Sequence, residues 1–223
     1  MPIYSISEAP KGHYFMGISL MSNVLFSKRT VRQYYNALGE KALSFLVIIA
    51  DSLEMWNYAY FKGLSLSEAR QKSLLVGKQY QSGYLKLSKL LPNFYVSLAS
   101  EIETHDAWKR IYEILRNFYS ENELFQKAVK LQIVENIGSK LKCRDVNGVP
   151  DLITNYILEE IAITVGIYSG ILMEQRIQIS PQLDNLLVDL YNGKFPELSH
   201  NLKIKSSELQ YVVYNPKAKE EQL

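Results

Sequence analysis

The first residue that could carry chemistry is Ser19, which lies near the end of an apolar, β-prone run over residues 13–20. A strand of this kind followed by a helical pattern, here residues 28–41, is typical of the opening of an α/β unit. Such units bind ligands at the carboxyl ends of their strands, which is where Ser19 is expected. Its hydroxyl is either a nucleophile or an ordinary turn serine that bonds its own backbone.

A phenol and a carboxylate share one face of a helix predicted late in the chain. Tyr156 and Glu160 lie four positions apart in a largely apolar stretch over residues 151–167, so both project from the same side. Together they suit an ammonium group. The alternative interpretation is a core tyrosine with a satisfied hydroxyl and a glutamate that simply faces water.

Several familiar signatures are missing from the sequence. Neither a Gly-x-Gly-x-x-Gly run after the first strand nor a Gly-x-x-x-x-Gly-Lys-Ser/Thr run is present, so nucleotide binding is not indicated. The three histidines are scattered and Cys143 stands alone, so no metal-ligand spacing occurs and we expect no metal. Met21 stands where a nucleophile elbow around Ser19 needs glycine, which argues against a hydrolase triad.

The elements that must position these groups alternate between strands and helices. We expect strands at residues 13–20, 42–50, 94–99, 176–180 and 209–214, with an irregular segment before the first. We expect helices at residues 28–41, 52–61, 65–91 and 151–167, two between 104 and 141, and one that Pro181 opens and Tyr191 closes. This order predicts α/β architecture: a single Rossmann-like domain over residues 1–223 with a mostly parallel central sheet flanked by helices and a frayed tail at 216–223.

The composition limits the class of protein and the compartment in which we expect it. The chain is 47% hydrophobic and 22% charged, which is typical of a globular protein. A single cysteine allows no intrachain disulfide and the first residues show no secretory signal, so we expect a cytoplasmic protein. No apolar segment reaches the roughly 20 residues that a bilayer requires, so we expect no membrane association.

Basic residues recur along the helix predicted at residues 65–91. The net charge of +2 does not by itself indicate a nucleic-acid partner. The basic side chains of this helix are either a solvated face or a phosphate-binding surface. They are Arg70, Lys72, Lys78, Lys86 and Lys89.

These pieces together resemble the cyclodipeptide synthases, which take amino acids from charged tRNA and join two of them into a cyclic dipeptide. Ser19 and the glycine two positions before it, Gly17, match that family's strand-end nucleophilic serine. Tyr156 and Glu160 match its Tyr-x-x-x-Glu helix. The order and separation of the two motifs and the strand and helix pattern over most of residues 10–215 agree as well.

The resemblance implies a fold similar to the catalytic domain of class I aminoacyl-tRNA synthetases, without their ATP-binding motifs. It implies a ping-pong reaction in which Ser19 receives the first aminoacyl group as an ester while Tyr156 and Glu160 hold its amine. A second charged tRNA then gives a dipeptidyl-enzyme, which closes on itself and leaves. It also implies two aminoacylated tRNAs as substrates and no cofactor, because the tRNA ester is already activated. We expect a monomer.

The sequence departs from the family at one site position. The family usually has a tyrosine at the end of a later strand, thought to assist proton transfer and followed by Gln, His or Pro. Here the strand at residues 176–180 ends in Ser180 followed by Pro181, so we expect Ser180 in the place of that tyrosine. Ser22 stands three residues after the nucleophile, in place of the Asn of one subfamily, and we expect it to line the substrate site with Gly17 and Pro181. The helix at residues 65–91 is only moderately basic, which predicts weak, salt-sensitive tRNA binding.

The two amino acids are not specified by these motifs. Ile48, at the end of the second strand, is expected to form a wall of the first pocket, and the nearby Asp51 and Glu54 hint at a polar or cationic side chain. Two other functions are consistent with the same residues. One is a Rossmann-like module that binds charged tRNA or a small amine without turnover, and the other is a simple serine acyltransferase or esterase.

Overall fold

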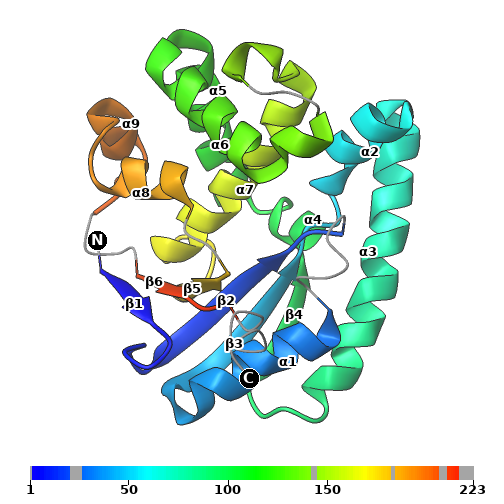
Figure 1. Ribbon diagram of the computed structural model, residues 1–223, viewed down its shortest axis with the longest axis vertical. Coiled ribbons are helices and arrows are strands. Elements are labelled where there is room, and N and C mark those ends of the chain that lie inside the picture. The colour runs from blue at the N-terminus through cyan, green and yellow to red at the C-terminus, as the bar shows by residue number, and fades with distance from the viewer. Residues whose placement is uncertain (1, 21–26, 142–144, 182–183, 206–209, 216–223) are drawn as a thin grey trace.

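A parallel sheet forms the centre of the protein in the computed structural model, which describes residues 2–20, 27–141, 145–181, 184–205 and 210–215. Six strands lie in the order β1-β6-β5-β2-β3-β4, and each neighbouring pair is parallel (Figure 1). They are β1 (Ile3–Ser5), β2 (Gly12–Ile18), β3 (Ala42–Ile49), β4 (Phe94–Leu98), β5 (Ile177–Ser180) and β6 (Tyr211–Val213). The predicted α/β class with a parallel sheet is confirmed.

Helices cover both faces of this sheet (Figure 1). Packed on one face are α1 (Lys28–Leu38) and α3 (Leu66–Ser88). The other face carries α5 (Asp106–Glu121), α6 (Glu123–Leu141), α7 (Asp151–Tyr168), α8 (Asn185–Tyr191) and α9 (Pro196–Asn201). The remaining elements are α2 (Glu54–Lys62), which contacts both α3 and α7, α4 (Ala99–Ile102), and 3-10 turns at Gly39–Lys41 and Val146–Gly148.

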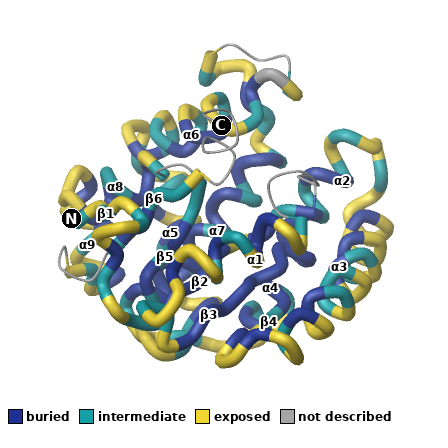
Figure 2. Tube along the Cα trace, turned by 60° about the horizontal axis from the view of Figure 1, so that its bottom comes forward, coloured by how far each residue is buried: buried dark blue, intermediate teal, exposed yellow. Residues whose placement is uncertain are grey.

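Strand β3 shows how the sequence produces two cores. Successive side chains of a strand point to opposite faces, so Phe45 and Val47 join the cluster under α1 and α3 while Leu46 and Ile48 join the cluster under α7. The last six residues of β3 are all buried, and Figure 2 shows this part of the strand in the colour of buried residues. This double burial explains the uninterrupted apolar run at residues 45–49, which is typical of parallel sheets.

Local signals in the sequence predicted most helix boundaries. The start of α3 follows the expected capping box, because the Ser65 side chain accepts from the Glu68 backbone N–H while Glu68 accepts from the Ser65 backbone. Gly63 ends α2 in the left-handed conformation, at φ 62°. The helix expected to end at residue 91 ends three residues earlier.

Two predictions were wrong. The segment before residue 13 is not irregular throughout: β1 pairs with β6, at the other end of the chain. Pro181 does not open the following helix, since α8 begins at Asn185, where the Asp184 side chain accepts from the Leu187 backbone N–H and so caps it. The predicted tail at 216–223 and residue 209 of the last strand lie outside the described residues, as does Cys143.

The order of connections creates a place for a ligand. From β2 the chain moves outward to β3 and β4, and it then crosses back to β5 on the other side of β2. Ligands of open α/β sheets bind at the carboxyl ends of the strands where the order reverses in this way. In this fold that place lies between the ends of β2 and β5. None of the described helices is long and apolar enough to cross a bilayer.

Candidate active site

Ser19 directly follows β2, at the reversal of the sheet. Along β2 the side chains alternate, so Phe15, Gly17 and Ser19 share the face that looks toward α7. A Cβ placed on Gly17 would meet nothing within 4 Å, which shows that the glycine leaves open space beside the serine. Ile48 is the register partner of Gly17 on β3 and lines the same space.

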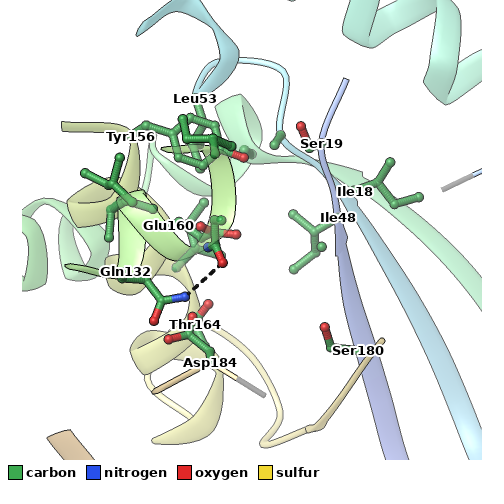
Figure 3. Close-up of a pocket in the computed structure, with 18 of the residues that line it drawn as sticks. Ile18, Ser19, Ile48, Leu53, Gln132, Tyr156, Glu160, Thr164, Ser180 and Asp184 are labelled. Atoms are coloured by element: carbon green, nitrogen blue, oxygen red, sulfur yellow. Dashed lines mark hydrogen bonds between the residues drawn. The ribbon is translucent and has the colours of Figure 1, made fainter. Parts of the chain in front are cut away.

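Helix α7 supplies the facing wall. Tyr156 and Glu160 lie one turn apart and both line a cavity of about 350 Å³ together with Ser19. Figure 3 shows Tyr156 and Glu160 on one side of it, with Ser19, Ile48 and Ser180 on the other. The two predicted motifs, about 140 residues apart in sequence, therefore meet in one cavity.

The Tyr156 hydroxyl shares a hydrogen bond with Ser19. Burial raises the pKa of Tyr156 well above its usual value of 10, and the negative charges of Glu160 and Glu54 raise it further. At neutral pH the side chain is consequently a phenol rather than a phenolate. It can donate a hydrogen bond to an oxygen bound near Ser19.

Glu160 lies in the cavity without a hydrogen-bond or ion-pair partner among the described residues. Burial raises the pKa of Glu160 to about 8, and the neighbouring Asp184 and Glu54 add to the shift. The carboxyl group is therefore mainly protonated at neutral pH while the site is empty. A cation entering the cavity would offset both causes and favour the carboxylate, so the arrangement suits an ammonium group.

A carboxylate also contacts the serine, and the sequence motifs did not assign it this position. Glu54, the first residue of α2, is fully buried and accepts a hydrogen bond from Ser19 Oγ at Oε1. Its second oxygen, Oε2, accepts from Asn57 Nδ2 at 2.8 Å. Asp51, named with Glu54 as a hint of polarity, does not line the cavity: its carboxylate accepts from the backbone and hydroxyl of Ser100 at 2.9 and 2.6 Å.

The other end of the cavity is polar. Ser180, which closes β5, and the next residue, Pro181, both line the cavity, and the Ser180 hydroxyl shares a hydrogen bond with Tyr211 of β6. Tyr211 is 1% exposed and faces the same cavity, because β6 pairs with β5 in the register Gln178 to Tyr211. A tyrosine from the adjacent strand therefore accompanies the serine that stands at the expected position.

Apolar residues form most of the remaining wall. Isoleucines from α6 and α7 surround the middle of the cavity, and Leu53 and Phe61 close it on the side of α2. Gln132 of α6 and Thr164 of α7 lie toward the polar end with Asp184 (Figure 3). Gln132 Nε2 donates a hydrogen bond to Oδ1 of Asn136, which also lines the cavity, at 3.2 Å. Burial raises the pKa of Asp184 to about 6.

The predicted tRNA-contacting residues all lie on or directly after α3, at the edge of the molecule (Figure 1). All five are exposed: Arg70, Lys72, Lys78, Lys86 and Lys89. The first two also make contacts within the protein, since Arg70 lies 4.0 Å from Glu103 and the Lys72 ammonium lies 5.3 Å from the centre of the Tyr58 ring. Ser22, predicted to line the substrate site, lies outside the described residues.

No cluster of three or more histidine, cysteine or acidic side chains that could hold a metal ion occurs in the described part of the chain.

Neither protein-family models nor curated proteins give a match to the sequence. Solved structures, in contrast, match the fold of this chain. A cyclodipeptide synthase from Fluoribacter dumoffii superposes with a TM-score of 0.69 at 13% identity, over 92% of each chain.

The chain has the cyclodipeptide synthase fold. A second such enzyme, from Streptomyces noursei, matches with a TM-score of 0.61 at 16% identity, over 95% of this chain and 99% of that one. A third structure, from Mycobacterium tuberculosis, matches with a TM-score of 0.65 at 16% identity, over 81% of this chain and 78% of that one. It is described as demonstrating that cyclodipeptide synthetases are related to type I tRNA synthetases. Within this fold Ser19, Tyr156 and Glu160 line one cavity.

Proposed function

We propose that this protein is an enzyme that takes aminoacyl groups from two charged tRNAs and joins them into a cyclic dipeptide. One observation carries the proposal: Ser19 and Tyr156 share a hydrogen bond and line one cavity with Glu160, whose carboxyl group has no hydrogen-bond partner among the described residues. The cyclodipeptide synthase fold supports the same function.

In the first step the Ser19 hydroxyl attacks the ester carbonyl of an aminoacyl-tRNA and displaces the ribose oxygen. The product is an aminoacyl ester on Ser19. Its α-ammonium group lies against Glu160 and the Tyr156 hydroxyl, which offsets the cost of ionising a buried carboxyl group. Positioning supplies most of the acceleration, because the bond that breaks is already an activated ester.

In the second step the ammonium group of the bound aminoacyl group first releases a proton to solvent, and the resulting amine attacks the ester carbonyl of a second charged tRNA. The bond from that carbon to the ribose oxygen breaks, the ribose oxygen takes up the amine proton, and a dipeptidyl ester remains on Ser19. The terminal amine then attacks the ester carbonyl at Ser19, so the ring closes and Ser19 is released. Closure needs a proton donor and acceptor near the moving amine. The paired hydroxyls of Ser180 and Tyr211 at the polar end of the cavity are suited to this task.

The exposed basic residues of α3 are the proposed tRNA contacts. Lys78, Lys86 and Lys89 are spaced by eight and three positions, so they fall on one side of the helix, where they can meet successive phosphates. Such a sparse set gives weak binding that falls steeply with salt. Weak binding suits a protein that must exchange one tRNA for another within each cycle.

Product analysis tests the proposal directly. The protein is expressed in bacteria and the medium is searched for cyclic dipeptides by mass spectrometry, with Ser19→Ala as the matched control. We expect cyclic dipeptides from the wild type alone. Equal production by Ser19→Ala would reject the covalent role of Ser19, whereas turnover of small activated esters without tRNA would favour a simple acyltransferase or esterase.

A further inference from the structure

Glu54 lies closer to the chemistry than its place in the sequence suggested. It is the first residue of α2, it is 0% exposed, and its Oε1 accepts the hydrogen bond that Ser19 Oγ donates. A carboxylate at the amino end of a helix is stabilised by the helix dipole. The amide of Asn57, one turn later, holds the other oxygen at 2.8 Å and so fixes the orientation of the carboxylate.

We infer that Glu54 is the general base that takes the Ser19 proton as the serine attacks the aminoacyl ester. The inference rests on the proposed function and adds a catalytic residue to it. Nucleophilic serines are weak at neutral pH and need an adjacent base oriented by a third group. Ser19, Glu54 and Asn57 form such a series through direct hydrogen bonds.

The proton balance of the step is complete without a further reactant. As the bond from Ser19 Oγ to the carbonyl carbon forms, the hydroxyl proton passes to Glu54 Oε1. As the bond from that carbon to the ribose oxygen breaks, Glu54 returns the proton to the departing oxygen.

The other groups around Ser19 are less suited to this task. Tyr156 is a phenol whose pKa is raised well above 10, so it holds its own proton and acts as a donor. Glu160 is mainly protonated in the empty site, with a pKa raised to about 8. In the proposed reaction it holds the ammonium group and is not available as a base.

The chain contains a matched control for this contact. Ser52 Oγ donates to Glu103 Oε1 in the same manner, and Ser52 is 1% exposed. Neither of these two residues lines the cavity. Substitution of Glu103 therefore removes a buried serine–glutamate contact of the same type without touching the site.

The experiment measures acylation of Ser19 in a single turnover. Purified protein in excess is mixed with total bacterial tRNA charged with the twenty amino acids, and the aminoacyl adduct is followed by intact mass. For Glu54→Gln we expect the maximal rate to fall about 100-fold or more, the lower end of the usual effect of general acid–base catalysis. The protein concentration at half-maximal rate should stay unchanged, because Glu54 contacts the nucleophile rather than the tRNA. Glu103→Gln should acylate within about twofold of the wild type, because it removes no group of the site.

A second variant covers the case in which Glu54→Gln folds poorly. Glu54→Ala leaves room for a small carboxylate, so added sodium formate should restore part of its acylation rate and should restore nothing in Ser19→Ala. Thermal melts followed by circular dichroism report the folding of each variant. Wild-type acylation by Glu54→Gln, or the lack of any formate effect in folded Glu54→Ala, overturns the assignment of Glu54 alone. Absence of an adduct on the wild type overturns the proposed function and this inference with it.

Discussion

Two adjacent glutamates of α7 have opposite surroundings. Glu159 is 6% exposed and accepts hydrogen bonds from Trp56 Nε1, at 2.9 Å, and from Tyr112. Glu160 lines the cavity and has no hydrogen-bond partner among the described residues. Burial raises the pKa of both side chains to about 8.

The comparison separates two meanings of a shifted pKa. Perturbed pKa values gather at functional sites, but structural networks produce them as well. Glu159 belongs to such a network, because protein donors already satisfy its carboxyl group. Glu160 has the same shift beside empty space, so only Glu160 retains capacity for a ligand. A shifted pKa indicates a site here only when a cavity and an unmet hydrogen-bonding group accompany it.

The largest expected effect comes from exchanging each glutamate for its amide. Glu160→Gln should lower cyclic dipeptide formation on the order of 100-fold, because an amide holds an ammonium group weakly and the bound amine loses its position. Glu159→Gln is the matched control and should stay within about threefold, since it alters no group of the cavity. Purified protein, charged tRNA and mass spectrometry of the product measure both. If both variants lose the same cyclic dipeptide formation, Glu160 has no role in the reaction that Glu159 lacks.

Each glutamate also has a tyrosine near it, which gives a second matched pair. Tyr211 lies at the cavity and its pKa is raised in part by Glu160, whereas Tyr112 bonds to Glu159. Tyr211→Phe should slow ring closure about 10-fold, less than a full acid–base effect because Ser180 remains. The dipeptidyl adduct on Ser19 should then accumulate in intact-mass spectra. Tyr112→Phe should show no such accumulation, and if it does, the proton-transfer role of Tyr211 is wrong.

The hydrogen-bond donors to Glu159 should contribute to the stability of the fold rather than to activity. Trp56→Phe leaves a buried carboxyl group without its indole donor, which costs about 1–3 kcal/mol of unfolding free energy. For a domain of this size 1 kcal/mol lowers the melting temperature by roughly 2–4 °C. Trp108→Phe is the control, because Trp108 is buried and its Nε1 has no hydrogen-bond partner in the described part of the chain. If both variants lose the same stability, the Trp56 hydrogen bond contributes nothing.

The free energy of unfolding should also depend on pH, in a direction set by the raised pKa of Glu159. An unfolded glutamate loses its proton near pH 4.5, while folded Glu159 keeps it to about pH 8. Between these values the folded state binds more protons, so its free energy of unfolding falls as pH rises. Glu159→Gln, which stays neutral, should lose less melting temperature between pH 5 and pH 8 than the wild type does. Calorimetry at a series of pH values measures the slopes, and identical slopes would contradict the buried, shifted glutamate.

Sequence reasoning reached the parts of this site that depend on local pattern. The β-prone run before Ser19 and the four-residue spacing of Tyr156 and Glu160 each follow from a single element. Their meeting in one cavity follows from the rule that parallel sheets bind ligands where the strand order reverses. These residues are the ones that the resemblance to cyclodipeptide synthases also identified.

Contacts that depend on the exact path of the chain were not predictable. The short turn after β3 brings Glu54 beneath Ser19, and no periodicity in the sequence encodes that approach. Tyr211 reaches Ser180 only because β6 pairs with β5 in one register, between segments about 30 residues apart. Pro181 was placed in a helix because proline favours the first turn, but the Asp184 side chain caps α8 further along.

The smallest expected effect tests the electrostatics of Glu160 alone. Asp184 raises the pKa of Glu160, whereas Glu103 raises that of Glu159. Asp184→Asn keeps an N-cap for α8 and removes the charge, so the pKa of Glu160 should fall toward its usual range. If catalysis requires the Glu160 carboxylate, activity should then rise at lower pH than in the wild type. Glu103→Gln lowers the pKa of Glu159 by the same reasoning and should leave the pH profile of activity in place. If the pH profile of activity moves with Glu103→Gln but not with Asp184→Asn, the titrating group is Glu159 and not Glu160.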